Sequence, residues 1–133
     1  MTRLYYALPE SGYPDLVAFL GSLEPKLRLK LLNQFYLLIT QPLPNEPIVK
    51  HFTIEKYCEL YELRIRGKIM VRIIFALRED GSILFLAPFI KRHKRNTMQA
   101  LESSLRMLKQ IHAKDLGVCE VPISELVRDI STK

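Results

Sequence analysis

The sequence predicts a mixed α/β (α+β) domain that combines helices with an antiparallel sheet. Apolar residues recur at helical spacing between residues 16 and 39 and again between residues 98 and 111. Apolar and polar residues alternate between residues 61 and 77, which is typical of strands with one buried face. The run from Ile83 to Ile90 is apolar throughout, as expected of a strand covered on both faces.

Composition favours a single compact domain. The chain has 133 residues, of which 48% are hydrophobic and 26% charged, and this balance argues against a disordered chain. No apolar run approaches the roughly 20 residues of a membrane span, and residues 1–10 lack the apolar core of a signal peptide. We therefore expect a cytoplasmic protein with no membrane partner.

Cysteine and histidine usage indicates neither a metal site nor a cofactor. Cys58 and Cys119 are too few for a disulfide framework, and the chain has no Cys-x-x-Cys pair. His51 and His112 have no partners at metal-ligand spacing. A reducing compartment is expected.

The first part of the chain predicts a strand followed by a helical hairpin. Arg3–Leu8 is a short aromatic and apolar run that is typical of a strand. Pro14 suits the first turn of one helix, and Pro25 suits that of a second. Residues 41–47 contain three prolines and predict a loop. For residues 48–58 the pattern leaves strand and irregular structure open.

Residues 61–90 predict a three-stranded antiparallel meander with one apolar face. The dipeptides Gly67-Lys68 and Asp80-Gly81 are placed as hairpin turns, and Pro88 marks the end of the last strand. Because side chains alternate between the faces of a strand, each face can be assigned from the sequence. The first face carries Tyr61, Leu63, Ile65, Ile69, Val71, Ile73, Phe75 and Leu77, and the second carries Glu62, Arg64, Arg66, Met70, Arg72, Ile74 and Ala76.

The last part of the chain predicts one long helix and a tail. Asn96 or Thr97 can cap a helix whose apolar positions run from Met98 to Ile111. Residues 1–112 are expected to form the domain. Residues 113–133 are expected to be a C-terminal extension of uncertain structure.

The positive charge of the chain is concentrated on the meander and the segment that follows it. Residues 61–95 contain nine Lys or Arg and three acids, a net charge of +6, which is also the net charge of the whole chain. The other 98 residues hold 11 basic and 11 acidic side chains. A clustered positive field favours a polyanionic partner such as nucleic acid, although an acidic protein or a lipid surface would satisfy the same field.

The type and position of these cations suit phosphate binding. Arginine donates two parallel hydrogen bonds from a planar fork and keeps its charge at any relevant pH. The candidates are Arg64, Arg66, Lys68 and Arg72 on the meander, and Lys91, Arg92, Lys94 and Arg95 at the mouth of its last strand. If the ligand is RNA, such a site can stabilise the attack of a ribose 2′-hydroxyl on the adjacent phosphate.

That reaction also needs a proton-transfer group. His93 lies inside the run Lys91–Arg95, where the flanking charges keep its imidazole available as a base, and Glu62 is the other candidate. Two alternatives stay open at this point. His93 is also typical of a solvated polar residue, and Glu62 is also placed to pair with Arg64 or Arg66.

Four motifs in fixed order resemble the RelE/ParE superfamily of type II toxins, and in particular its HigB-like, phage-related branch. They are Tyr61-Glu-Leu-Arg-Ile65, Val71-Arg-Ile-Ile-Phe75, Leu86-Ala-Pro-Phe-Ile-Lys-Arg92 and the apolar helix after Thr97. The resemblance covers roughly residues 4–112. It implies an RelE-like fold with an N-terminal strand, a helical hairpin, a three-stranded antiparallel meander and a final helix.

The resemblance also implies an activity and a set of partners. Members with RelE or HigB activity cut messenger RNA without a metal, often on the ribosome, and pair with a cognate antitoxin that often carries a helix-turn-helix domain. By position, the resemblance implies catalytic roles for Arg64, Arg72, Lys91 and Arg92, and the need for a proton-transfer group adds His93. Arg66, Lys68, Lys94 and Arg95 are then expected to bind RNA.

Two other functions remain open from the sequence. The ParE branch of the same superfamily inhibits DNA gyrase by protein contact. A phage-derived protein that binds RNA without cutting it is the other alternative, because family members often place a tyrosine near the C-terminus and here no tyrosine follows Tyr61.

Overall fold

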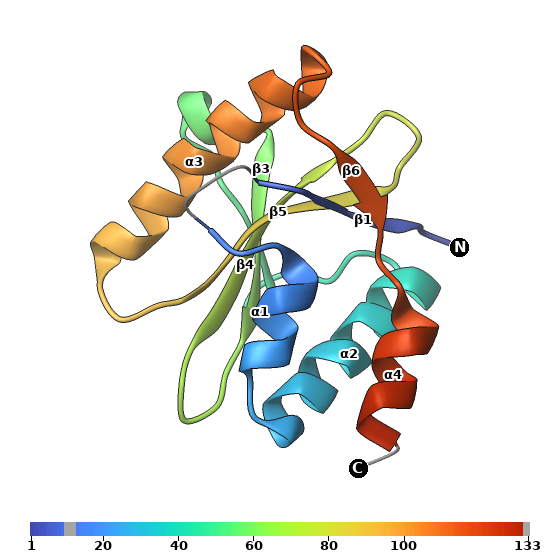
Figure 1. Ribbon diagram of the computed structural model, residues 1–133. Helices are drawn as coiled ribbons and strands as arrows, with labels where there is room; N and C mark the ends of the chain where they lie inside the picture. Colours follow the sequence, from blue (N-terminus) through green and yellow to red (C-terminus); the bar gives the residue numbers. More distant parts are fainter. Residues whose placement is uncertain (10–12, 132–133) are drawn as a thin grey trace.

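The computed structural model describes residues 1–9 and 13–131, and it confirms the predicted α+β class. A six-stranded sheet forms the middle layer, with strand order β2-β3-β4-β5-β1-β6. The strands are β1 (Leu4–Ala7), β2 (Val49–His51), β3 (Leu60–Ile65), β4 (Val71–Leu77), β5 (Ile83–Ile90) and β6 (Val118–Glu120). Helices α1 (Leu16–Ser22), α2 (Pro25–Thr40) and α4 (Ile123–Ser131) cover one face, and α3 (Lys94–His112) covers the other (Figure 1).

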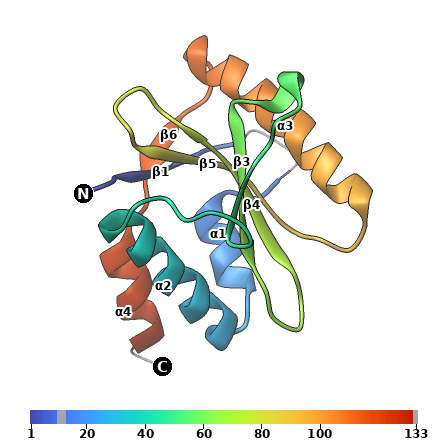
Figure 2. The ribbon, with the colours of Figure 1, turned by 180° about the vertical axis from the view of Figure 1, so that it is seen from behind.

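The predicted meander forms the centre of the sheet. Strands β3, β4 and β5 pair antiparallel in sequence order, and the β3–β4 hairpin extends beyond the rest of the sheet (Figure 2). Strand β1 lies parallel to β5, and β6 closes that side antiparallel to β1. Within residues 48–58, the structure forms the edge strand β2 and a 3₁₀ turn, η1 (Glu55–Tyr57).

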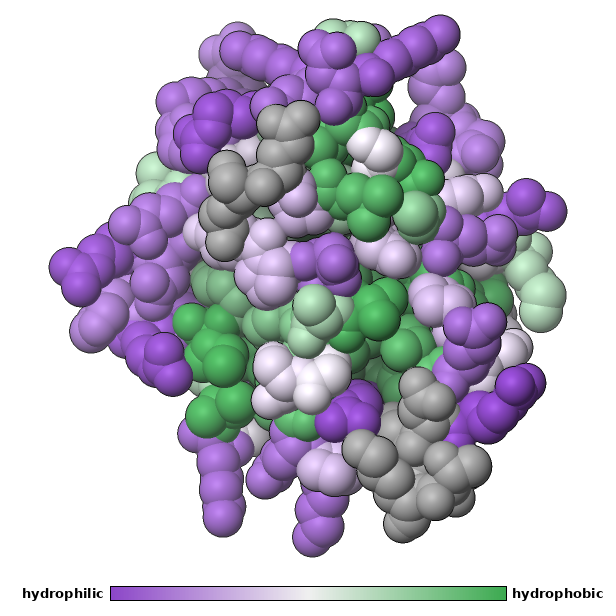
Figure 3. Space-filling view, in the orientation of Figure 1, coloured by the Kyte–Doolittle hydropathy of each residue, from purple (hydrophilic) through white to green (hydrophobic). Residues whose placement is uncertain are grey.

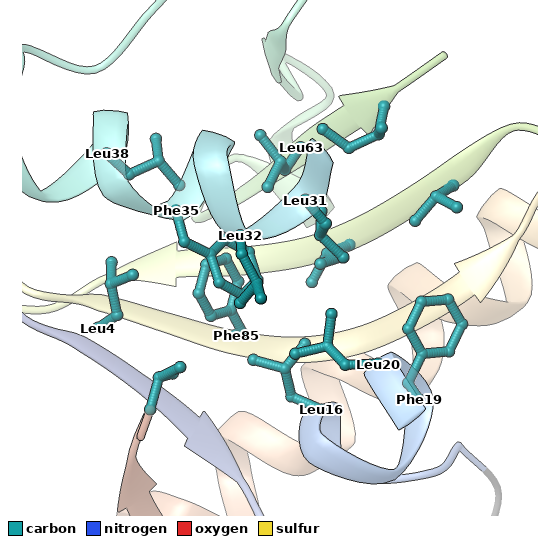
Figure 4. Packing of buried hydrophobic residues seen from close by; sticks show 14 of the residues in the cluster. Leu4, Leu16, Phe19, Leu20, Leu31, Leu32, Phe35, Leu38, Leu63 and Phe85 are labelled. Carbon is teal, nitrogen blue, oxygen red and sulfur yellow. The ribbon is translucent and has the colours of Figure 1, made fainter. Parts of the chain in front are cut away.

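The helical hairpin forms as predicted, but Pro14 lies one residue before the N-cap of α1 and not in its first turn. Asp15 is the N-cap instead, because its Oδ1 accepts a hydrogen bond of 2.8 Å from the Ala18 N–H. Pro25 occupies the first turn of α2, where its missing N–H has no helical acceptor to lose. Both helices then press their leucines and phenylalanines onto the sheet, and Phe35 stacks on Phe85 with ring centroids 4.8 Å apart (Figure 4).

The alternation assigned from the sequence places the two cores on opposite faces of the sheet. Leu63, Val71 and Ile73 join α1 and α2 in the larger core. Leu60, Ile74 and Ala76 face α3 in the second core. The predicted face assignments are therefore confirmed for Leu63, Val71, Ile73, Ile74 and Ala76, and Leu60 follows the same alternation.

Several predicted boundaries are wrong. Ile69 and Met70, which were expected to begin the second strand of the meander, lie in the turn before β4. Strand β5 continues through Pro88 to Ile90, with Pro88 opposite Ile73. A proline is tolerated there because β1 pairs with β5 only from Ile83 to Phe85. Within the described part of the chain, one side of β5 therefore has no strand partner at residue 88.

Helix α3 begins before the predicted caps, with His93 as the N-cap. Asn96 lies inside the first turn and caps the helix from there. Its Oδ1 accepts hydrogen bonds from the preceding N–H groups of Arg92 (2.9 Å) and His93 (2.8 Å). Lys94 and Arg95 consequently belong to the helix rather than to the preceding loop.

Residues after 112 add two elements to this architecture. Strand β6 pairs with β1 through Tyr5, Tyr6 and Ala7, and α4 packs beside α2 (Figure 1). The domain boundary at residue 112 stays a prediction. Among the described residues, no helix is both long and apolar enough to cross a membrane.

Candidate functional site

Two arginines meet on the α3 side of the sheet. Arg64 of β3 and Arg72 of β4 are directly opposite each other in the antiparallel register. Like charges in this arrangement repel each other, so the pair needs an anion nearby. Burial makes this need stronger, because Arg72 is only 5% exposed.

Glu62 supplies that anion from inside the protein. It lies two residues before Arg64 on the same face of β3 and is 1% exposed. Its Oε1 accepts a hydrogen bond of 2.8 Å from Arg64 Nε and lies 3.7 Å from Arg72 Nε. The pairing of Glu62 with Arg64, left open by the sequence, is therefore present. Glu62, Arg64 and Arg72 thus form a triad of one carboxylate and two guanidinium groups, and this triad has a net positive charge.

The triad is incompletely paired. Within the described part of the chain, Glu62 Oε2 and Arg72 Nε have no hydrogen-bond partner. Burial lowers the pKa of the Arg72 guanidinium; Glu62 opposes this effect, and the charges of Arg64 and Arg66 add to it. An additional anion at this position would stabilise the charged form of Arg72.

Arg64 has the geometry of a ligand-binding residue. Glu62 holds its Nε, and its side chain is 17% exposed. Within residues 1–9 and 13–131, the two terminal nitrogens of Arg64 donate no hydrogen bond. The side chain is thus anchored at one nitrogen while two others remain available for an anion.

Further cations border the triad. Lys91 continues the sheet past the end of β5, because its N–H donates a hydrogen bond of 2.8 Å to Met70 O beside Arg72. Lys50, which was not among the cations expected from the sequence, lies opposite Glu62 in the β2–β3 register. The Lys50 ammonium lies over the Phe52 ring, 5.3 Å from its centroid. The sequence pattern of residues 48–58 leaves strand and irregular structure open, so it does not place Lys50 on a strand face.

The start of α3 adds an exposed group of cations. Arg92, His93, Lys94 and Arg95 are exposed around the N-terminus of the helix, and its first turn contains no acid. Cations are unfavourable at the positive end of a helix dipole, so this arrangement raises the local positive potential. Such a potential attracts anions.

The structure separates the candidate residues into three groups, of which the start of α3 is one. It brings Arg64 and Arg72 together on one face, and it connects Lys91 to the strand of Arg72 through the hydrogen bond to Met70 O. Arg66 and Lys68 lie in the exposed β3–β4 turn instead. Lys68 faces the α1–α2 connection, on the other side of the sheet from the triad.

The two proton-transfer candidates differ in access. Glu62 is covered and holds the arginines, so it cannot readily reach a polymer outside. His93 is exposed at the N-cap of α3. In residues 1–9 and 13–131, no three His, Cys, Asp or Glu side chains gather as a metal-binding cluster would.

A second polar cluster connects η1 to α3. Glu102 Oε1 accepts hydrogen bonds from Lys56 Nζ (2.6 Å) and from the Tyr57 hydroxyl (2.5 Å). These bonds lower the pKa of Glu102 and raise those of Lys56 and Tyr57. Tyr57 is buried against α3, so the cluster fixes the segment that follows β2 to the helix.

Fold and site together define a small basic α+β protein of RelE-like architecture that carries an arginine pair on the sheet. The chain belongs to the family "Phage derived protein Gp49-like", which matches residues 18–109. This family is part of the RelE/HigB-like toxin superfamily and is associated with toxins of toxin–antitoxin systems. In a comparison with curated proteins, no sequence matches the chain.

Proposed function

We propose that the chain is the toxin of a type II toxin–antitoxin system and acts as a metal-independent endoribonuclease on messenger RNA, which inhibits translation. The observation that supports this function best is the Arg64–Arg72 pair over Glu62, since a buried carboxylate fixes the arginines while Arg64 keeps free donors. Preorganised cations of this kind stabilise the charge that develops on a phosphate in the transition state.

The proposed reaction is attack of a ribose 2′-hydroxyl on the adjacent phosphorus. The bond from phosphorus to the 5′-oxygen breaks, which leaves a 2′,3′-cyclic phosphate and a 5′-hydroxyl. His93 accepts the proton of the 2′-hydroxyl, and the 5′-oxygen takes a proton from solvent. Arg64, Arg72, Lys91 and Arg92 hold the phosphate and balance its charge, while Arg66, Lys94 and Arg95 bind the flanking backbone.

The partners follow from the same proposal. Messenger RNA is the substrate, and a translating ribosome would present it as a single strand with unpaired bases. A cognate antitoxin with a helix-turn-helix domain would neutralise the toxin by covering the cationic face. Cleavage of free RNA by the purified protein, compared with cleavage in a translating extract, would determine whether the ribosome is required.

The main experiment is to induce the protein in growing cells and map new RNA 5′ ends across the transcriptome. Wild type should create ends within coding sequences, and Arg64→Ala should remove them. Lys109→Ala, an exposed cation at the far end of α3, serves as the control and should behave as wild type. Intact messenger RNA together with normal growth would refute the proposal, whereas intact messenger RNA with loss of supercoiling would indicate gyrase inhibition.

A second function, RNA binding without turnover, is favoured by the depth of Arg72. A guanidinium that is 5% exposed and already beside a carboxylate can strengthen the field of the site without touching the substrate. Purified protein would then bind RNA with a strong salt dependence and leave it uncut. A single-turnover assay with excess protein separates this case from slow cleavage.

A further inference from the structure

An open groove lies on the face of the sheet opposite the arginine pair. It runs between the α1–α2 connection and the β3–β4 turn and has a volume of about 770 Å³. Its apolar lining residues are Leu23, Leu27, Ile69 and Ile90. Ile69 is 38% exposed and the adjacent Met70 is 40% exposed, so two neighbouring apolar side chains reach the surface in this turn. Figure 3 shows hydrophobic surface beside this hairpin, between longer hydrophilic side chains.

The border of this groove is cationic. Lys26 and Lys30 on α2 and Lys68 in the turn line it, against a single acid, Glu24. The Lys30 ammonium donates a hydrogen bond to Arg66 O, which ties α2 to the hairpin. In the described ranges, none of these three lysines forms an ion pair with a carboxylate. The groove therefore combines an aliphatic floor with uncompensated positive charge.

The aliphatic floor and the lysines at the border indicate which kind of ligand the groove can bind. Single-stranded nucleic acid binds through bases that stack on aromatic rings, and none of the described residues that line the groove is aromatic. Aliphatic floors accept Leu, Ile or Val side chains, and lysines at the border suit carboxylates. A concave site fits a single peptide segment better than a flat membrane surface does.

We propose that this groove binds an acidic amphipathic segment of a partner protein, with aliphatic side chains of the segment on Leu27, Ile69 and Ile90 and its carboxylates against Lys26 and Lys68. The proposal is independent of RNA cleavage. It also gives Lys68 a role different from the RNA contact expected from the sequence, because the structure directs this residue to the groove.

Occupancy of the groove would act on the arginine site through the hairpin. Gly67, Lys68 and Ile69 form one wall of the groove, and they belong to the turn that joins the strand of Arg64 to the strand of Arg72. A bound segment would hold this turn against α2. Lys30 of α2 already contacts the turn through its hydrogen bond to Arg66 O. Segment binding and anion binding are thus expected to influence each other.

The test uses the full chain and a fluorescent peptide of about 16 residues, with leucines at helical i, i+3, i+4 and i+7 spacing and glutamates elsewhere. Wild type should bind it in an anisotropy titration. Lys26→Glu and Ile69→Asp should each weaken binding by about tenfold or more. Leu29→Asp, on the exposed side of α2 outside the groove, is the matched control and should change affinity by less than about twofold.

Three results would overturn the proposal. They are failure of the wild type to bind the peptide, equal binding by all variants, and equal binding of a peptide in which lysine replaces glutamate. Preferential binding to vesicles rich in anionic lipid would assign the groove to a membrane surface instead. Lys26→Glu should leave RNA binding unchanged, so loss of peptide binding by this variant is distinguishable from failure of the proposed nuclease function. Circular dichroism confirms that each variant is folded.

Discussion

The two faces of the central sheet differ in what they bury, although the same strands form both. Towards α1 and α2, every buried residue of β3 and β4 is apolar. Tyr61 stacks on Phe75, and Phe75 meets Phe85 edge to face. Towards α3, the same strands bury Glu62 and Arg72 among apolar neighbours. A charged group in such a place costs stability, so its presence on only one face separates the face that stabilises the fold from the face that carries the site.

The strongest test of this contrast is a truncation on the apolar face. Phe85→Ala should lower the free energy of unfolding by about 3–5 kcal/mol, because it leaves a cavity between Phe35 and Phe75. Urea unfolding monitored by circular dichroism measures the loss as a lower midpoint at constant slope. Leu37→Ala, on the exposed side of α2, should cost little. Equal losses would mean that this face is not the main source of stability.

The charged face should respond to the loss of its carboxylate. Glu62→Gln keeps the shape but leaves Arg64 and Arg72 without a counter-charge, and we expect a loss of about 2 kcal/mol. Glu59→Gln, an exposed neighbour, is the control. If Glu62→Gln is as stable as wild type, the carboxylate does not hold the arginines together.

A third change separates charge from geometry in the site. Arg64→Lys keeps the positive charge but loses the planar fork, so RNA cleavage should fall by about tenfold or more while the salt dependence of binding stays the same. Arg64→Ala should in addition reduce the slope of binding against salt concentration by about one. RNA-binding titrations at several salt concentrations measure the slope for each variant. An unchanged slope for Arg64→Ala would contradict the proposal.

The smallest expected effect is the pH response of the cluster that joins η1 to α3. Lys56, and then Tyr57, hold the pKa of Glu102 below its ordinary value of 4.5. The contribution to stability is therefore fully present above that ordinary value and is lost as the pH falls through the lower pKa of the folded state. Melting temperatures of wild type and Glu102→Gln should differ slightly at neutral pH and converge in acid. A constant difference down to about pH 2 would contradict this account.

The sequence predicts much of the fold because its patterns are local. Alternation in β3 and β4 assigns the faces, and the 3.6-residue period of α2 gives its buried leucines. The boundaries at Pro88 and His93 were missed because they depend on tertiary context. Pro88 fits within β5 because the neighbouring strand β1 is short. The start of α3 depends on Asn96, whose side chain accepts a hydrogen bond from the N–H of His93.

The candidate site was harder to predict than the fold. Alternation places Arg64 and Arg72 on one face, but the register that sets them opposite each other depends on how the hairpin closes. The sequence does not predict that Lys50 lies near the site, because only the pairing of β2 with β3 brings it opposite Glu62. Lys68 follows Arg66 in a turn, and no periodicity indicates on which side of the sheet its side chain lies.

The position of β1 has a consequence for how the protein is made. This strand precedes both of its neighbours in the sheet by a long stretch of chain, because β5 starts at Ile83 and β6 starts at Val118. A chain that folds while it is being synthesised must therefore keep β1 unpaired until β5 and β6 have been made, since such distant pairings form late. The complete six-stranded sheet can form only after the residues of β6 have left the ribosome.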